Sequence, residues 1–524
     1  MKRNKYIFLL LLLLTFAAAQ TACSRQPSAQ LTDPPPSPTL EPLQIPPEQL
    51  TESSSENPEA AEPPLEVPLY DDYAVSLEVD PAARTVNGVE RVSFTNRSDT
   101  ALDEVVFRVY LNAFKENETP KPYFDAYAPK IFALGEDYGY MNILHVSADN
   151  MDLNYAHNDT VLRVKLNEPL LKDQTVQVRI QFEAYVPMIA HRTGANARAM
   201  WCGNFLPVLS YLEDGKWATE PYYPAGDPFR LESANYTVEI TTPSNYTVAG
   251  SGAKTEEVDE EKKVTTFSSR MARDFAFAVS ANYKIIETVT ESGVRLQFYH
   301  YTDSLDLLKV MDTIAQGFTY YERSIGAYPY KQVTVVETDM FVNGMENSNI
   351  IFMDSAYMQR SQEYASLIHE IGHQWFFDIA GNNQITEAWL DEGITTFVQE
   401  RCFNQTEEAL REKLKADYDS LKSVHSSIVP GENRVIAGSV AGYKNWSDYY
   451  QIKYIKAKIM LYALREEIGA ENFTLLINGY FSANSYRIAT GADFIAKAEE
   501  IYGSSLKGFF DEWLYGEGLP EFPD

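Results

Sequence analysis

The chain has 524 residues, too many for one ordinary core and enough for two or three domains. Hydrophobic residues make up 45% and charged residues 23%, which is the balance of a globular protein. The formal net charge is −30. Because so acidic a surface repels phosphate backbones, we expect no nucleic-acid partner.

The first residues have the form of an export signal. A basic start at residues 2–5 precedes the apolar run Tyr6–Ala19, which is shorter than the roughly 20 residues that span a bilayer. The segment Ala19–Cys23 resembles a bacterial lipoprotein signal, although Gln20 stands where such signals usually have Leu. We therefore expect residues 1–23 to direct export and Cys23 to carry a lipid that anchors the protein to the outer face of a bacterial membrane. Simple cleavage and secretion is the alternative.

Residues 24–68 have the composition of a disordered spacer. They hold 12 Pro and eight Asp or Glu, and so cannot bury enough apolar surface to offset their chain entropy. Such a Pro-rich segment stays extended and would hold a folded part away from its anchor. The other two cysteines, Cys202 and Cys402, are too few for a disulfide framework or a metal cluster. Either a single bridge or two buried thiols would fit.

From residue 69 to about residue 295, short segments alternate apolar and polar residues, which is the pattern of half-buried strands. Pro81 and the pair Asn87-Gly88 are expected to interrupt them. The region is therefore predicted to be an antiparallel, strand-rich domain. Its expected strands are Tyr73–Val79, Val89–Phe94, Val105–Leu111, Val176–Phe182, Tyr236–Ile240 and Phe275–Val279.

From residue 296 to residue 524 the apolar residues recur mostly at helical spacing. This predicts a second domain that is mixed but mainly helical. Strands are expected at Gln332–Thr338 and Asn349–Phe352. The expected helices are Ser304–Gly326, Ser361–Ala380, Thr406–Leu421, Asp448–Ile468 and Leu506–Tyr515.

One short motif in this second domain is typical of metal chemistry. His369 and His373 enclose Glu370 in the pattern H-E-x-x-H. Residues four apart lie on one face of a helix, so both imidazoles can reach one ion. Zinc binds neutral imidazole readily, and Glu370 would stand beside a zinc-activated water as a base. By frequency alone, a chance match in a chain with seven His is roughly a one-in-a-hundred event.

A catalytic zinc site needs a third protein ligand and leaves one position for water. Glu392 follows His373 within the segment Glu387–Gly393, which is expected to be helical and to pack against the first helix. Its carboxylate would complete a set of two His and one Glu around a single Zn²⁺ per chain. Metal-bound imidazoles also need hydrogen-bond partners of their own. Asp391, Glu387 and Asp378 are all candidates for that role.

These residues resemble the aminopeptidase N-type zinc metallopeptidases of the gluzincin group. The resemblance rests on H-E-x-x-H followed by Glu392, and on a second motif, Asn343–Asn347, that is similar to G-x-M-E-N. Here Asn343 replaces the first Gly, whereas Met345, Glu346 and Asn347 agree. The resemblance covers roughly residues 70–524 and is looser in the earlier parts, such as the segment Tyr222–Phe229.

The resemblance implies further site residues. Glu346 would bind the free amino group of a peptide, and Gly344, Met345 and Asn347 would complete this substrate-binding segment. The family places a Tyr in a Y-x-K-G-like segment to stabilise the oxyanion of the intermediate. The matching residue is Tyr454, in a stretch where Ala457 replaces the Gly. Tyr443, Tyr449 and Tyr450 are close enough in sequence to shift this assignment.

The predicted protein is thus an α+β multidomain metallopeptidase. A saddle-like or sandwich-like β domain at residues 69–295 would precede a thermolysin-like catalytic domain at residues 296–524. The expected activity is removal of N-terminal residues from peptides with a free amino end. The alternatives are an endopeptidase or another zinc hydrolase on the same scaffold, or a surface-tethered binding protein without catalysis.

Overall fold

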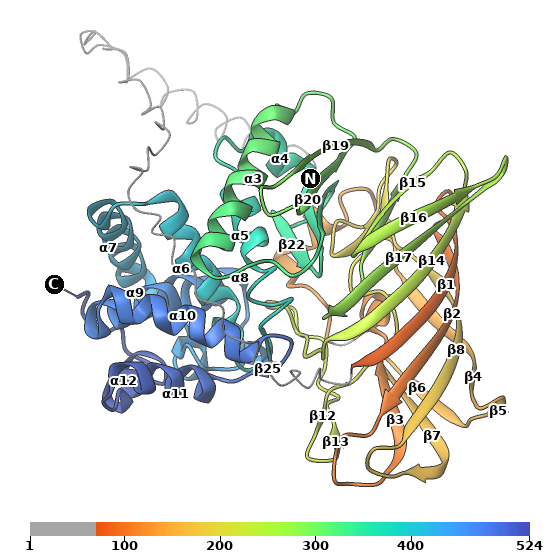
Figure 1. Ribbon diagram of the computed structural model, residues 1–524, viewed down its shortest axis with the longest axis horizontal. Coiled ribbons are helices and arrows are strands. Elements are labelled where there is room, and N and C mark those ends of the chain that lie inside the picture. The colour runs from red at the N-terminus through yellow and green to blue at the C-terminus, as the bar shows by residue number, and fades with distance from the viewer. Residues whose placement is uncertain (1–69, 119, 524) are drawn as a thin grey trace, which may run out of the picture. The chain divides into compact units, whose positions relative to one another are not determined.

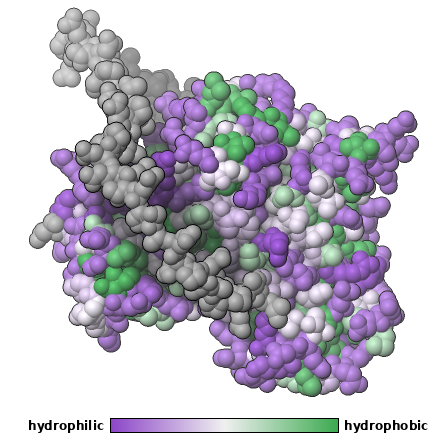
Figure 2. Space-filling model, in the orientation of Figure 1, coloured by the Kyte–Doolittle hydropathy of each residue, from purple (hydrophilic) through white to green (hydrophobic). Residues whose placement is uncertain are grey.

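The structure, a computed structural model, describes residues 70–118 and 120–523. The expected signal peptide with Cys23 and the expected spacer at residues 24–68 lie outside these residues. Figure 1 shows sheets at one side of the folded part and helices at the other. The face seen in Figure 2 is mainly hydrophilic, as the acidic composition predicts. None of the described helices combines the length and the apolar character needed to cross a membrane.

The N-terminal part is built on a twisted sheet of eight strands. In β1 every second residue is buried and the others are exposed, because one face of the sheet covers the core and the other faces solvent. Neighbouring strands are antiparallel, as predicted, except that β1 and β14 run parallel. The strand order is β16 (Ala253–Val258), β17 (Lys262–Ala272), β14 (Ala234–Pro243), β1 (Asp71–Asp80), β2 (Thr85–Thr95), β8 (Thr175–Tyr185), β4 (Tyr140–Ala148) and β5 (Met151–Asp152).

Two smaller sheets and a hairpin complete this β domain. One sheet has the order β15 (Thr247–Gly250), β18 (Phe277–Ser280), β10 (Met200–Cys202) and β9 (Thr193–Ala195). The other has the order β11 (Val208–Leu209), β3 (Leu102–Arg108), β7 (Val161–Leu170) and β6 (Tyr155–Asn158), with β12 (Leu212–Glu213) and β13 (Lys216–Trp217) forming the hairpin and α2 (Ala128–Ile131) a short helix. Their apolar side chains join those of the large sheet in one core.

The pair Asn87-Gly88 does not interrupt a strand, so that prediction was wrong. Both residues lie inside β2, and Gly88 pairs with Phe182 of β8. A Cβ atom on Gly88 would come within 2.1 Å of the Phe182 ring. Glycine is therefore present at this position to make room for the ring and not to form a turn.

A five-stranded sheet begins the C-terminal half of the described chain. Its order is β19 (Lys284–Val289), β20 (Arg295–His300), β21 (Gln332–Thr338), β23 (Ile350–Asp354) and β22 (Gly344–Asn347). The sheet starts at Lys284, so the predicted boundary at residues 295/296 falls within its first hairpin. β22 lies at the edge, paired with β23 alone among the described strands, and it carries the G-x-M-E-N-like segment.

Helices make up most of the remaining chain. They are α3 (Leu307–Ser324), α4 (Ser355–Arg360), α5 (Ala365–Gly372), α6 (Glu392–Phe403), α7 (Glu407–Val424), α8 (Trp446–Tyr450), α9 (Ala457–Ile468), α10 (Ala470–Asn484), α11 (Gly491–Tyr502) and α12 (Lys507–Trp513), with a two-stranded sheet of β24 (Gly381–Asn382) and β25 (Ile488–Ala489). A π-helical segment, Gln451–Lys456, joins α8 to α9. The predicted α+β organisation is confirmed.

The helix predicted over Ser361–Ala380 is much shorter. Tyr364 has a left-handed backbone with φ of 50° at the N-terminus of α5, and the α-helix ends at Gly372. Residues 373–380 are buried turns, so their apolar pattern continues without helical structure. α10 and α11 were not predicted. Cys202 and Cys402 are both free thiols, so the disulfide left open by the sequence does not form.

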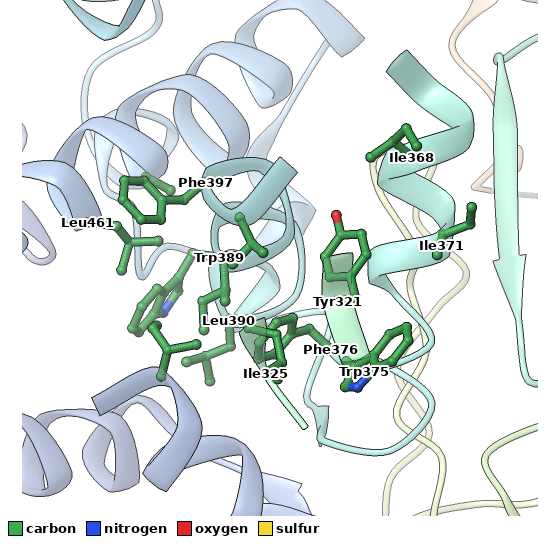
Figure 3. Packing of buried hydrophobic residues seen from close by; sticks show 14 of the residues in the cluster. Tyr321, Ile325, Ile368, Ile371, Trp375, Phe376, Trp389, Leu390, Phe397 and Leu461 are labelled. Atoms are coloured by element: carbon green, nitrogen blue, oxygen red, sulfur yellow. The ribbon is translucent and has the colours of Figure 1, made fainter. Parts of the chain in front are cut away.

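α5 and α6 are fixed against each other by a shared apolar core. Ile368 and Ile371 of α5 and Phe397 of α6 point into this core, together with Trp389 (Figure 3). At Gly372 an added Cβ would lie 2.5 Å from the Tyr321 hydroxyl and 2.8 Å from Thr395 Cγ2. The glycine therefore lets α3 and α6 approach α5 closely, and this packing fixes the separation of the side chains that follow.

Candidate active site

The structure brings the three predicted metal ligands together. His369 lies in the last turn of α5, His373 caps that helix, and Glu392 is the first residue of α6. The two imidazole Nε2 atoms are 2.9 Å apart, and Glu392 Oε2 lies 3.2 Å from that of His369 and 3.4 Å from that of His373. One zinc ion about 2.0–2.1 Å from each atom would set tetrahedral donors roughly 3.3 Å apart. The donor set therefore fits one zinc ion.

Each imidazole has a second partner that orients its ring. Asp391 Oδ1 lies 2.6 Å from Nδ1 of His373, and the side-chain oxygen of Gln399 lies 3.1 Å from Nδ1 of His369. Such partners leave the Nε2 atom of each ring free for a metal. Of the three candidates from the sequence, Asp391 takes this position. Glu387 instead accepts a hydrogen bond from the Gly491 amide.

The third candidate, Asp378, lies in a separate buried network. Its carboxylate accepts a hydrogen bond from the Asn349 side chain at 3.2 Å. Burial raises its pKa to about 7. Sequence reasoning missed Gln399, although it lies seven residues after Glu392, two turns further along α6.

The electrostatics of the ligand set favour a cation between the three side chains. Burial alone would raise the pKa of Glu392, but hydrogen bonds from His369 and His373 outweigh it and lower this pKa to about 2. Burial would also lower the pKa of His373, but Asp391 and Glu346 reverse the effect and raise it well above its ordinary value. The site thus stabilises positive charge, as a divalent ion requires.

Glu370 lies against the edge strand β22. A Cβ atom on Gly344 would come within 2.5 Å of both Cγ and Oε1 of Glu370, so only glycine allows this approach. Burial raises the pKa of Glu370 to about 8, with His373 opposing the shift and Glu392 adding to it. A carboxyl group that titrates near neutrality is suited to accept and return a proton.

Glu346 lies two residues further along β22 and is also buried. Burial raises its pKa well above the ordinary value, and Asp227 raises it further. Asp227 reaches the same cavity from the β domain, and its Oδ1 atom accepts a hydrogen bond of 2.5 Å from Arg192. The sequence contained Asp227 within the loosely similar segment Tyr222–Phe229 but gave no signal of this position.

Asn347 differs from the other residues of this segment. Its side chain is fully buried, and neither its oxygen nor its nitrogen has a hydrogen-bond partner among the described residues. Its backbone oxygen accepts a hydrogen bond from Gln374. Asn347 is not among the residues that line the active-site cavity, whereas Gly344, Met345 and Glu346 are.

Tyr454 contacts two of the predicted ligands from the π-helical segment. Its hydroxyl donates a hydrogen bond to Glu392 Oε1. Its ring stacks on that of His369 with the centroids 5.7 Å apart. Tyr443 and Tyr449 are buried, and Tyr450 lines the cavity. Among these four tyrosines, only Tyr454 hydrogen-bonds a predicted ligand.

The three predicted ligands line one cavity of about 760 Å³ together with Glu346, Glu370 and Tyr454. Many of its lining residues belong to β22, α5, α6 and the π-helical segment. The cavity is lined by Asp227, Val342, Asn343, Gly344, Met345, Glu346, Glu363, Ala365, Ser366, His369, Glu370, His373, Glu392, Thr396, Gln399, Glu400, Phe403, Asn404, Lys413, Trp446, Tyr450, Tyr454 and Lys458.

Comparison with known proteins relates this site to a family. Residues 309–513 match the model of the peptidase family M1 domain. Glutamyl aminopeptidase of Homo sapiens is 24% identical over 309 residues, which are 55% of this chain and 32% of that protein. Aminopeptidase N of Streptomyces lividans is 24% identical over 239 residues, 41% of this chain and 27% of that protein. The chain thus spans about a third of the length of the curated relatives it matches.

The fold is shared more widely. The crystal structure of an M1 zinc metallopeptidase from Deinococcus radiodurans superposes with a TM-score of 0.66 at 16% sequence identity, covering 87% of this chain and 96% of that one. Most of the chain therefore shares the fold of this solved structure. The match over residues 309–513 includes α5 and α6, which carry the predicted ligands. It also includes the G-x-M-E-N-like segment on the edge strand β22. Residues 309–513 are thus similar to the peptidase family M1 domain, in agreement with the resemblance of the motifs to the aminopeptidase N-type zinc metallopeptidases.

Proposed function

We propose that the protein is a zinc aminopeptidase that removes N-terminal residues from peptides. One observation carries this proposal: the buried carboxylate of Glu346 lines the same cavity as the three metal donors and Glu370. A carboxylate beside the reaction centre holds an ammonium group by a charge-assisted hydrogen bond. It thereby sets the distance from the amino end of the chain to the cleaved bond.

The residues of the site have distinct tasks in this reaction. A zinc ion held by His369, His373 and Glu392 supplies Lewis-acid polarisation of the peptide carbonyl and makes water a better nucleophile at neutral pH. Glu370 takes the proton from the attacking water and returns it to the departing amine. Tyr454 donates a hydrogen bond to the oxygen that becomes negative.

The edge strand β22 positions the substrate for these steps. Because β22 pairs with β23 alone among the described strands, its other edge offers backbone groups to an extended peptide. Glu346 would hold the ammonium end of such a peptide, and Gly344 leaves space for Glu370 beside the scissile bond. Related M1 zinc metallopeptidase structures have been solved with L-arginine and with a Tyr-Ser-Ala substrate bound, which supports a cleft of this kind.

The test is a panel of short peptides, each with a free amino end and in an N-acetylated form. The purified zinc-loaded protein should cleave the free peptides at the first bond and leave the acetylated ones intact. Cleavage of both forms at internal bonds would instead show an endopeptidase. No turnover with zinc bound would show a binding protein without catalysis.

We further propose that the protein is exported and anchored through a lipid on Cys23. The support is the basic start, the apolar run and the small residues before Cys23. Mass spectrometry of the mature N-terminus should find a diacylglyceryl mass on Cys23 and a membrane-associated protein. A cleaved, unmodified N-terminus in the soluble fraction would show secretion instead.

A further inference from the structure

Two buried lysines flank Tyr454 in the π-helical segment. Lys453 and Lys456 both have no exposed surface, and neither forms an ion pair among the described residues. Burial lowers the pKa of Lys453 to about 7 and that of Lys456 to about 8. Taking an ammonium group out of water is costly unless its hydrogens are bonded. In the structure the hydrogens of both ammonium groups are directed to backbone oxygens.

Both ammonium groups bond only to backbone carbonyls. The Nζ atom of Lys453 donates to the carbonyl of Ile436 at 2.7 Å, to that of Val435 at 3.3 Å, and to that of Gly438. An ammonium group has three hydrogens, so this set satisfies all of them. The loop at residues 435–438 is thereby fixed to the π-helical segment.

Lys456 makes a matching connection one turn later. Its Nζ atom donates to the carbonyl of Arg434 at 2.7 Å and to that of Gly516 at 2.8 Å. Together the two lysines tie this segment to residues 434–438 and to the chain beyond α12. We call these five contacts the carbonyl clamp.

The clamped segment packs directly on the first turn of α6. An added Cβ on Gly393 would come within 2.7 Å of Ala457 Cβ and 3.4 Å of the backbone oxygen of Lys453. Gly393 follows Glu392, the residue that the Tyr454 hydroxyl contacts. A shift of the π-helical segment would therefore change the position of that hydroxyl relative to the ligand set. π-Helical turns are rare and often occur at functional sites.

We propose that Lys453, supported by Lys456, is a positioning residue that holds the Tyr454 hydroxyl where the substrate oxyanion forms. This inference rests on the proposed aminopeptidase reaction. The carbonyl clamp acts through Tyr454 and touches no substrate. Its loss lowers kcat, because the hydroxyl matters most in the transition state, and leaves KM nearly unchanged.

A double-mutant cycle tests this role. Tyr454→Phe should lower kcat by about 10²–10³-fold, the effect of removing one oxyanion donor. Lys453→Met should lower kcat by about 10–100-fold, since a misplaced donor keeps part of its effect. The double variant should be no slower than Tyr454→Phe alone. An equal loss from Lys453→Met in both backgrounds would overturn the proposal, because it would act independently of Tyr454.

Matched controls distinguish a loss of Tyr454 positioning from a general loss of folding or zinc binding. Lys444→Met removes an exposed lysine from the same region and should leave kcat unchanged. Zinc content and the thermal unfolding midpoint are measured for each variant. If Lys453→Met does not fold, Lys453→Gln and Lys456→Met test the same clamp. A folded, zinc-loaded variant of either lysine with full kcat would also overturn the proposal.

A fluorine label at Tyr454 separates this inference from the proposed function. With 3-fluorotyrosine at position 454, the ¹⁹F resonance reports the surroundings of the ring without turnover. Lys453→Met should shift or broaden it, whereas Lys444→Met should not. An unchanged resonance would overturn the clamp. Absence of any peptidase activity in the unmodified protein would overturn only the proposed reaction.

Discussion

Carboxylates are buried in both halves of the molecule, but their surroundings differ. In the C-terminal half, Glu392 lies 3.2–3.4 Å from two imidazoles, and Asp391 lies 2.6 Å from one of them. In the β domain, Glu90 of β2 is fully buried, and neither of its oxygens has a hydrogen-bond partner among the described residues.

The two environments change ionisation in opposite directions. Burial raises the pKa of Glu90 well above its ordinary value. Burial acts on Glu392 too, but its histidine partners outweigh it and lower the pKa to about 2. A buried acid therefore favours its ionised form only where cationic groups or hydrogen-bond donors contact it. Substitution of the buried acids around the ligand set should lower activity or zinc affinity. Substitution of Glu90 should instead raise the stability of the fold.

The largest effect is expected at Glu370, a buried acid that must exchange a proton. Glu370→Gln keeps the shape but cannot take a proton from water, so kcat should fall by about 10²–10⁴-fold. Zinc content, measured by atomic absorption, should stay at one ion per chain. Undiminished hydrolysis of a fluorogenic aminoacyl substrate would contradict the role of Glu370 as the base.

A smaller loss is expected at Glu346, a buried acid that awaits a cationic substrate. Glu346→Gln leaves a side chain that cannot ionise when an ammonium group binds, so kcat/KM for free-amine peptides should fall by about 10–100-fold. Glu363→Gln, at an exposed acid of the cavity rim, is the matched control and should change little. Equal kcat/KM for Glu346→Gln and the unmodified protein would refute amine binding by this side chain.

The next effect concerns metal affinity and not turnover. Asp391→Asn removes the charge beside His373, so zinc should bind about 10–100-fold more weakly. A competition titration against a chelator measures this change. Glu387→Gln, whose carboxylate contacts Gly491 and no imidazole, should bind zinc as the unmodified protein does. Unchanged affinity in Asp391→Asn would show that this carboxylate is not needed to orient the ring.

The sequence was sufficient for the residues whose geometry is local. His369 and His373 are one helical turn apart, and Glu392 begins the next α-helix, so their spacing alone indicated that they meet. The fold class followed from the change of apolar period near residue 300. The extent of α5 did not follow, because residues 373–380 are buried turns with the same apolar content as a buried helix.

Other features depend on contacts between distant segments. Asp227 comes from the β domain, more than a hundred residues before the motif. The partner of His373 was one of three acids, and only the packing of α5 against α6 selects Asp391. The contacts of Lys453 are with backbone carbonyls, which leave no residue-type signal in a sequence. The roles of these residues therefore depend on the three-dimensional fold and could not be predicted from the sequence.

The last prediction concerns the stability of the fold and not its activity, at Glu90, where the buried acid has no partner among the described residues. Glu90→Gln should stabilise the fold increasingly as pH rises above about 4.3, because burial raises the pKa of Glu90 in the folded state whereas the unfolded chain ionises near that pH. The native stability linked to this group is present below that pH and is lost as pH rises toward the raised folded pKa. The variant does not titrate, so its advantage in thermal unfolding should widen from pH 5 to pH 8, by at most about 1.4 kcal/mol per pH unit. Glu78→Gln, an exposed acid of β1, should show no such widening. A constant difference between Glu90→Gln and the unmodified protein would mean that Glu90 stays ionised within the core, and the contrast with Glu392 would then disappear.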